Sequence, residues 1–448
     1  MSGSMGGIPG NVFPRRLDGP LPVAAGAEGL WIEDENGRRY LDASGGPVLV
    51  NIGHGREELA RAVADQILQC DYVHPTMFTA PPVEGLARAL ASHAPEGIGR
   101  FYFLSGGGEA VETAIKLARQ IHLECGRPQQ SQLIARWKSY HGLTLGALGA
   151  TGRTAFRVPF APMIPEVIHI PAPYCLRCSF GLTRPGCGLR CALALEETVQ
   201  NLGPDTVSAF LAETVSGATI AAVPPPPGYF QKIRDICDHY GILLILDEVL
   251  CGFGRTGRWF ASEHYGVVPD IVTMGKGLGG GAIALSAVGV QEKHFEAIRT
   301  GSGSFAHGGT FSHHNVAAAA GLTVTRIMER ERLVERAARM GELLHAKLRQ
   351  RLADHPNVAD IRGVGLLLGI EFVKDRSTLQ PFPRSGKLTE RLWQSIFQRG
   401  VVLYKSTGLA GIDGDALVIA PPYIVEEEHL DLIVETLAGG LDETLTRG

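Results

Sequence analysis

The middle of the chain alternates short apolar runs with helical patterns, and this alternation restricts the fold more than any other feature. Seven runs have the length and β-branched content of strands: 101–104, 133–137, 167–170, 207–212, 242–246, 271–274 and 285–290. Such alternation is typical of a mostly parallel sheet with crossover helices. The run 242–246 is apolar throughout, which indicates a central strand buried on both faces. We therefore predict an α/β fold with a mostly parallel seven-stranded sheet between helices.

Both ends of the chain are predicted to form a smaller α+β domain. From about Leu322 the pattern is helical, and apolar residues fall on one face between Leu333 and Leu348. Further elements are expected as strands at 30–33, 40–42, 366–373 and 417–420 and as helices at 389–399 and 426–444. The division we expect is an N-terminal part of the small domain in residues 1–75, a large domain in 76–322 and a C-terminal part in 323–448.

Charge and hydropathy exclude several classes of protein. The formal net charge is -4, and the basic residues form no runs, so we expect no nucleic-acid partner. No segment offers about eighteen uninterrupted apolar residues, which a membrane helix needs, and the N-terminus lacks the pattern of a secretion signal. We expect a cytoplasmic protein that does not bind membranes.

The eight cysteines do not describe a disulfide framework. Four of them cluster as two pairs: Cys175 with Cys178, and Cys187 with Cys191. Paired thiolates at this spacing can hold zinc or an iron–sulfur cluster, but the gap between the pairs is shorter than usual zinc spacing. We assign no metal ligand here, and a metal, disulfides and free thiols all remain open.

Two polar residues follow predicted strands at the edge where open α/β sheets bind their ligands. Asp247 comes directly after the run 242–246, and Lys276 lies in a glycine-rich turn after the run 271–274. A third strand leads through Ser105 and three glycines into a helix, and glycines at a helix N-terminus suit a phosphate. The spacing fits neither of the standard nucleotide-binding loops. An acid, a lysine and a phosphate cradle together indicate pyridoxal phosphate (PLP).

Longer motifs carry a resemblance to a known family. The segment Leu246-Asp247-Glu248-Val249, the later Gly252-Phe253-Gly254-Arg255-Thr256-Gly257 and then Lys276-Gly277-Leu278-Gly279 resemble the class III aminotransferases of PLP fold type I. Further motifs stand in the same order: Tyr140-His141-Gly142, Ala212-Glu213-Thr214-Val215, His307-Gly308-Gly309-Thr310, Arg362-Gly363-Val364-Gly365 and Ala420-Pro421-Pro422. The resemblance extends from about Gly19 to Leu441, so it covers the whole fold.

The resemblance implies roles for the residues that contact the cofactor ring. Lys276 would carry PLP as a Schiff base and then move the proton between substrate and cofactor. Asp247 would pair with the pyridinium nitrogen. Val249 and Tyr140 would pack on opposite ring faces, and His141 would shape the Tyr140 side.

The remaining implied residues surround the phosphate and the substrate entrance. Gly107 and Gly108 would donate backbone N–H groups to the phosphate, and Thr310 would reach it from the neighbouring subunit. The active sites would then be completed across the interface of a homodimer, or of a tetramer. Glu213 would lie near the phenolic oxygen of the cofactor.

The implied reaction moves an amino group from a primary amine or ω-amino acid to a 2-oxo acid. This chain has Val418 where relatives that bind an α-carboxylate often have Arg, and Gly108 where many have Ser or Thr. Small residues at Val48, Ala282 and Ala284 suggest a wide pocket. A racemase or epimerase, an aminomutase or a decarboxylating transaminase would share these motifs, and a non-catalytic PLP-binding protein is the alternative from another class.

Overall fold

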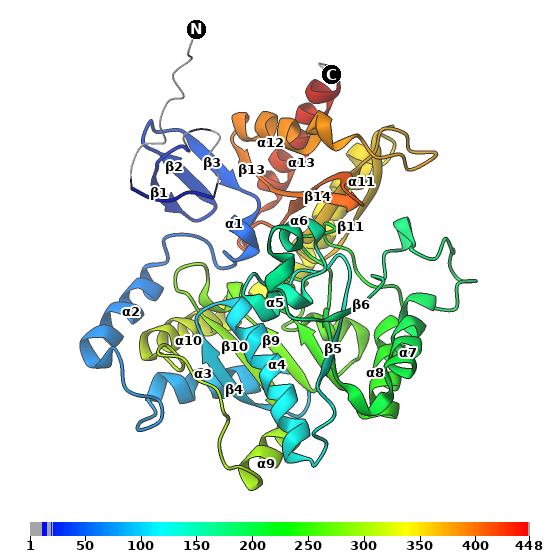
Figure 1. Cartoon of the computed structure of the whole chain (residues 1–448). Helices are drawn as coiled ribbons and strands as arrows, with labels where there is room; N and C mark the ends of the chain where they lie inside the picture. The colour runs from blue at the N-terminus through cyan, green and yellow to red at the C-terminus, as the bar shows by residue number, and fades with distance from the viewer. Residues whose placement is uncertain (1–10, 16–18, 20, 447–448) are drawn as a thin grey trace.

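The computed structural model describes residues 11–15, 19 and 21–446. A large sheet with flanking helices forms one part of the molecule, and two smaller sheets with three helices form the other (Figure 1). No helix within these described residues is long and apolar enough to cross a membrane.

The large sheet has seven strands, as predicted. Their spatial order is β4 (Ile98–Leu104), β10 (Ser286–Gln291), β9 (Ile271–Met274), β8 (Leu243–Asp247), β7 (Val207–Glu213), β5 (Gln132–Arg136) and β6 (Ile168–Ile170). The strands from β9 to β6 run parallel, whereas β10 is antiparallel to both of its neighbours. The prediction of a mostly parallel α/β sheet is confirmed, with strand ends shifted by up to three residues.

The central strand β8 is buried on both faces, as its unbroken apolar sequence indicated. Leu243 and Ile245 pack on one face with helix α4 (Gly107–Glu124). Leu244 and Leu246 pack on the other face with α7 (Arg190–Leu202) and α8 (Tyr229–Tyr240). Successive side chains of a strand point to opposite faces, so a strand covered on both sides carries apolar residues at every position.

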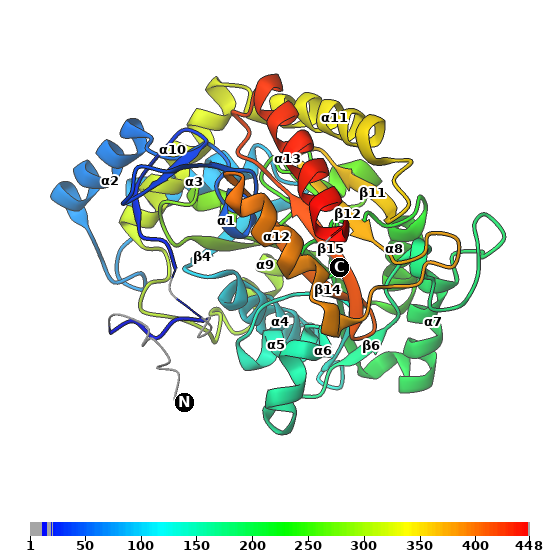
Figure 2. The same ribbon diagram turned by 90° about the horizontal axis from the view of Figure 1, so that it is seen from above.

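The chain ends meet in the smaller part of the molecule. One sheet joins β1 (Ala24–Glu28), β2 (Trp31–Asp34) and β3 (Arg39–Asp42) to β13 (Val401–Val402), which pairs in parallel with β3. The other sheet has the order β11 (Val358–Val364), β12 (Leu367–Phe372), β15 (Asp413–Ile419) and β14 (Tyr404–Ala410). Figure 2 shows α11 (Leu333–Leu352), α12 (Leu388–Gln398) and α13 (Glu427–Thr446) over these strands. Residues from both ends of the chain thus form this smaller part of the molecule together.

The remaining helices connect and cover the two parts. They are α1 (Gly45–Val48), α2 (Glu57–Cys70), α3 (Pro81–Ala91), α5 (Leu145–Ala150), α6 (Thr154–Arg157), α9 (Glu292–Thr300) and α10 (Asn315–Arg330). Helix α10 packs on α2 and α3 beside the large sheet. Helices α5 and α6 follow β5 and lie between the large sheet and the small domain (Figure 1).

Candidate active site

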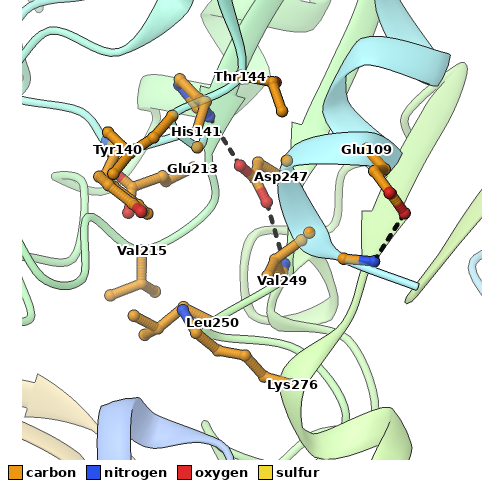
Figure 3. Close-up of a pocket in the computed structure, with 15 residues that line it drawn as sticks. Glu109, Tyr140, His141, Thr144, Glu213, Val215, Asp247, Val249, Leu250 and Lys276 are labelled. Atoms are coloured by element: carbon orange, nitrogen blue, oxygen red, sulfur yellow. Dashed lines mark hydrogen bonds and ion pairs between the residues drawn. The ribbon is translucent and has the colours of Figure 1, made fainter. Parts of the chain in front are cut away.

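A cavity of about 490 Å³ opens at the carboxyl ends of β7, β8 and β9, beside the start of α4 (Figure 3). Its lining consists of Gly106, Gly107, Gly108, Glu109, Tyr140, His141, Gly142, Leu143, Thr144, Glu213, Val215, Asp247, Val249, Leu250 and Lys276. The structure therefore brings together eight of the nine predicted site residues. The ninth, Thr310, lies exposed in the loop before α10 and does not line this cavity.

Asp247 ends β8 with its carboxylate held on both oxygens. Oδ1 accepts hydrogen bonds from the Val249 N–H and the Thr273 hydroxyl, each at 3.0 Å. Oδ2 lies 2.7 Å from Nδ1 of His141, and both side chains are buried. Since a carboxylate only accepts, His141 donates from Nδ1. These donors fix the orientation of the carboxylate at the cavity wall and stabilise its negative charge.

Lys276 follows β9 in a short 3-10 turn, Lys276–Gly279, with φ of 45°. A positive φ is uncommon for a residue with a side chain and often marks a functional position. Burial lowers the pKa of Lys276 below its usual value, and the carboxylates of Asp247 and Glu213 oppose that change. No described residue accepts a hydrogen bond from its amine. The amine therefore faces the cavity without a fixed partner (Figure 3).

The start of α4 forms a cradle of backbone amides. The first N–H groups of a helix have no acceptors within the helix and attract anions. Glu109 accepts the N–H groups of Ser105 and Gly106 at 3.0 Å each, whereas Gly107 and Gly108 line the cavity and their N–H groups have no acceptor among the described residues. A Cβ atom on Gly107 would lie 2.8 Å from Cγ1 of Val249, so this backbone passes the cavity only as glycine.

Glu213 is fixed at the end of β7 by two backbone groups. Oε1 accepts the Tyr140 N–H at 3.1 Å, and Oε2 accepts the Gly217 N–H at 2.9 Å. Burial raises the pKa of Glu213 above its usual value, while His141 and the Gly217 amide oppose the rise. The same contact fixes the Tyr140 backbone, and Tyr140 lines the cavity together with Glu213 and His141 (Figure 3).

Seven lining residues were not among the predicted site residues: Gly106, Glu109, Gly142, Leu143, Thr144, Val215 and Leu250. Val215 lies two residues after Glu213 and Leu250 follows Val249, so closeness in sequence to these predicted residues was the available signal. Thr144 lies close to Gly108, where a Cβ atom would be 3.6 Å from its hydroxyl oxygen. In contrast, Val48, Ala282 and Ala284 are not part of the cavity lining.

The clustered cysteines lie away from this cavity. All four, Cys175, Cys178, Cys187 and Cys191, are free thiols. Within residues 11–15, 19 and 21–446, no group of three or more His, Cys, Asp or Glu side chains is arranged to hold a metal ion. Tyr174 and Arg177, beside the first two cysteines, bind the buried carboxylate of Glu371 on β12. The segment that carries the clustered cysteines thus contacts the small domain.

The cavity fits PLP by its own residues. It offers a primary amine for an aldehyde, a carboxylate for a ring nitrogen and amides for a phosphate. Nε2 of His141 is buried at the wall without a hydrogen-bond partner among the described residues, so a polar group bound there can satisfy it. Fold and site together define a PLP enzyme.

Comparison with known proteins gives the family. The family described as aminotransferase class-III matches residues 13–441. The putrescine–pyruvate aminotransferase of Pseudomonas aeruginosa is 36% identical over 419 residues, which are 93% of this chain and 90% of that protein. The taurine–pyruvate aminotransferase of Bilophila wadsworthia is 36% identical, over 94% of this chain and 91% of the relative.

Solved structures agree. An (S)-enantioselective omega-transaminase from Thermomicrobium roseum superposes with a TM-score of 0.89 at 40% identity, covering 95% of this chain and 93% of the other. The chain belongs to the class III aminotransferases. It is a PLP-dependent transaminase that transfers an amino group from an amine to an oxo acid, as the sequence predicted.

Proposed function

We propose that Lys276 and Asp247 are the catalytic centre for amino transfer from a primary amine or ω-amino acid to a 2-oxo acid. The observation that carries this proposal is that both side chains, from the ends of neighbouring strands β8 and β9, line one cavity. When bound, PLP supplies an aldehyde that combines with amines and a ring that accepts the electron pair of the broken substrate bond.

Asp247 would hold the ring nitrogen of the bound cofactor in its protonated form. Its carboxylate is suited to this because His141, Thr273 and the Val249 amide already orient both oxygens. Groups that orient a reacting residue in this way strengthen its contact with the bound group.

Lys276 moves the proton of the reacting substrate carbon. A free lysine, with a pKa of about 10.4, is a poor base near neutral pH. Burial lowers the pKa of Lys276, so a larger fraction of the amine is neutral and able to accept a proton. Its position in a glycine-rich turn gives the amine access to the substrate.

The other predicted residues bind the cofactor. Gly107 and Gly108 would donate their amides to the phosphate, Val249 and Tyr140 would enclose the ring, and His141 supports Asp247. Glu213, whose carboxylate is fixed by the Tyr140 and Gly217 amides, would lie near the phenolic oxygen of the bound cofactor and orient the entering substrate. These assignments rest on the shared cavity lining.

The enzyme acts as a homodimer in which Thr310 of one subunit reaches the phosphate in the other. Large apolar side chains are exposed in α2, in the segment that follows it and in the Thr310 loop: Leu68 at 85%, Met77 at 73%, Phe78 at 64% and Phe311 at 60%. Tyr72 and Phe311 both contact the ring of His314, which joins these segments into one surface. Apolar surface of this kind is typical of a protein interface.

We also propose a cytoplasmic location and a domain division at residues 75 and 322.

The donor is an amine without an obligatory α-carboxylate, because Val418 is a buried residue of the small domain and offers no cation. The names of the putrescine–pyruvate and taurine–pyruvate relatives support this class of donor and favour pyruvate as acceptor.

A spectrophotometric donor screen tests the proposal. Purified enzyme loaded with PLP has a visible band from the lysine-bound cofactor, and each candidate amine is added without an acceptor. We expect diamines and ω-amino acids to remove the band and pyruvate to restore it. Inversion of an amino acid without loss of the band would instead indicate a racemase, and a colourless protein would contradict the Lys276 assignment.

A further inference from the structure

Arg153 lies directly before α6, next to the wall of the cavity. The carbon of its guanidinium group lies 4.8 Å from the centre of the Phe156 ring. The Phe156 ring in turn meets the ring of Tyr140 edge to face, with 5.9 Å between ring centres. Since Tyr140 lines the cavity, a single aromatic ring separates this guanidinium from the cavity wall.

Few contacts hold the guanidinium group of Arg153. Nη2 donates to the backbone oxygen and the hydroxyl of Thr407 on β14, both at 3.4 Å, which is long for a hydrogen bond. Arg157 on the same helix differs, because its Nη1 donates to the carbonyls of Leu148, Gly149 and Thr151 at 2.6 to 3.0 Å. Arg153 therefore keeps unused donors, whereas Arg157 is satisfied.

The charge of Arg153 has no acidic partner among the described residues. Burial lowers the pKa of Arg153, and its electrostatic neighbours are the hydroxyls of Tyr404 and Tyr140 and the like charge of Arg384. By comparison, Arg177 and Arg362 both pair with Glu371. A partly buried guanidinium group without a counterion favours the binding of an anion.

We infer that Arg153 is the subsite that recognises the carboxylate of the 2-oxo acid acceptor. The planar guanidinium group matches a carboxylate with two parallel hydrogen bonds, and the weak contacts to Thr407 and Phe156 leave it free to turn toward the cavity. This inference rests on the proposed function. Because Val418 offers no cation, Arg153 would supply the positive charge that binds the acceptor carboxylate. A monoamine donor has no carboxylate and needs no such charge.

Steady-state kinetics with two acceptors test the inference. Pyruvate carries the carboxylate, and propanal is a short aldehyde that lacks it. In Arg153→Gln we expect KM for pyruvate to rise by about 10-fold or more, the loss typical of a charge-assisted hydrogen bond, with kcat changed less than about threefold. KM for propanal stays within about twofold of the wild-type value. Arg153→Lys keeps the charge but loses the second hydrogen bond, so it gives an intermediate KM for pyruvate.

Thr407→Val is the matched control, because it removes the side-chain contact of Arg153 and keeps its charge. We expect this variant to leave KM for pyruvate unchanged. Equal changes with pyruvate and propanal, no change with either, or a pyruvate defect in Thr407→Val would overturn the inference. If Arg153→Gln does not fold, the comparison of pyruvate with propanal in Arg153→Lys decides. Absence of amino transfer from every donor in the wild-type enzyme would instead refute the proposed function.

Discussion

Nδ1 of His141 lies 2.7 Å from Oδ2 of Asp247, and both side chains are buried at the wall of the cavity. The two residues come from distant parts of the sequence, a loop after β5 and the end of β8. Because Thr273 and the Val249 amide occupy Oδ1, His141 is the side chain that orients the second oxygen. The orientation of the Asp247 carboxylate thus depends on residues that take no part in the chemical steps themselves.

Replacing His141 by Phe removes the donor to Oδ2 and keeps an aromatic ring. We expect kcat to fall about 10- to 100-fold, which corresponds to the loss of a hydrogen bond to a charged group. Thr273→Val is the control, because it removes a hydroxyl from Oδ1 while the Val249 amide remains. Stopped-flow measurement of the donor half-reaction should show the smaller loss in this control. Equal losses in both variants would mean that His141 has no special role.

Replacing Lys276 by Ala removes the amine that faces the cavity. We expect the visible band of the bound cofactor to disappear and turnover to fall by at least about 1,000-fold, because both binding and proton transfer use this group. The matched control is Lys293→Ala, whose side chain is 64% exposed and pairs with Asp270. Its spectrum and kcat should equal those of the wild type. A coloured and active Lys276→Ala enzyme would refute the central assignment.

The sequence predicted the large sheet well because its strands carry their own signal. Burial of β8 on both faces requires an apolar residue at every position, and this run then ends in Asp247. By contrast, β14 was not predicted, since Lys405, Ser406 and Thr407 are polar and its pairing with β15 shifts register after Thr407. Its strand character comes from the neighbouring strand, which a single sequence does not reveal.

The site could be predicted only where a motif marked it. Asp247 and Lys276 follow strands at one sheet edge, so their proximity follows from topology. Arg153 belongs to no recognised motif, and its place near Tyr140 depends on its contacts with the Phe156 ring and with Thr407 of β14. The bond from His141 to Asp247 likewise depends on a ring orientation that residue order does not fix.

Two glycines at the start of α4 should respond to substitution in opposite ways. A Cβ atom on Gly107 meets Val249 at 2.8 Å, so Gly107→Ala displaces a side chain of the cavity wall. A Cβ atom on Gly108 makes only ordinary contacts at 3.6 Å with Thr144, and Gly108→Ser adds a hydroxyl to the amide cradle. We expect Kd for PLP, measured by fluorescence titration, to rise in Gly107→Ala and to fall about fivefold in Gly108→Ser. Tighter binding of PLP by Gly107→Ala would contradict the assignment of the start of α4 as the phosphate site.

Stability at low pH should depend on Asp270, which lies before β9. Burial alone would raise the pKa of Asp270, but the hydrogen bond from His294, the charge of Arg234 and the Leu244 amide hold it well below its usual value. A lowered pKa stabilises the fold above the unfolded value of about 3.9, and that stabilisation is lost as the pH falls below it.

Asp270→Asn removes the buried negative charge that pairs with Arg234 and keeps the side-chain shape. At pH 7 we expect a destabilisation of about 3 kcal/mol, in the range for breaking a buried ion pair. Because the variant has no carboxylate to protonate, the difference in Tm from the wild type should shrink as the pH falls from about 4 to about 2, which thermal unfolding followed by circular dichroism measures. Asp238→Asn is the control. The side chain of Asp238, which also pairs with Arg234, is 67% exposed, so this ion pair contributes little to stability. A Tm difference that stays constant down to about pH 2 would show that the Asp270 charge does not stabilise the fold.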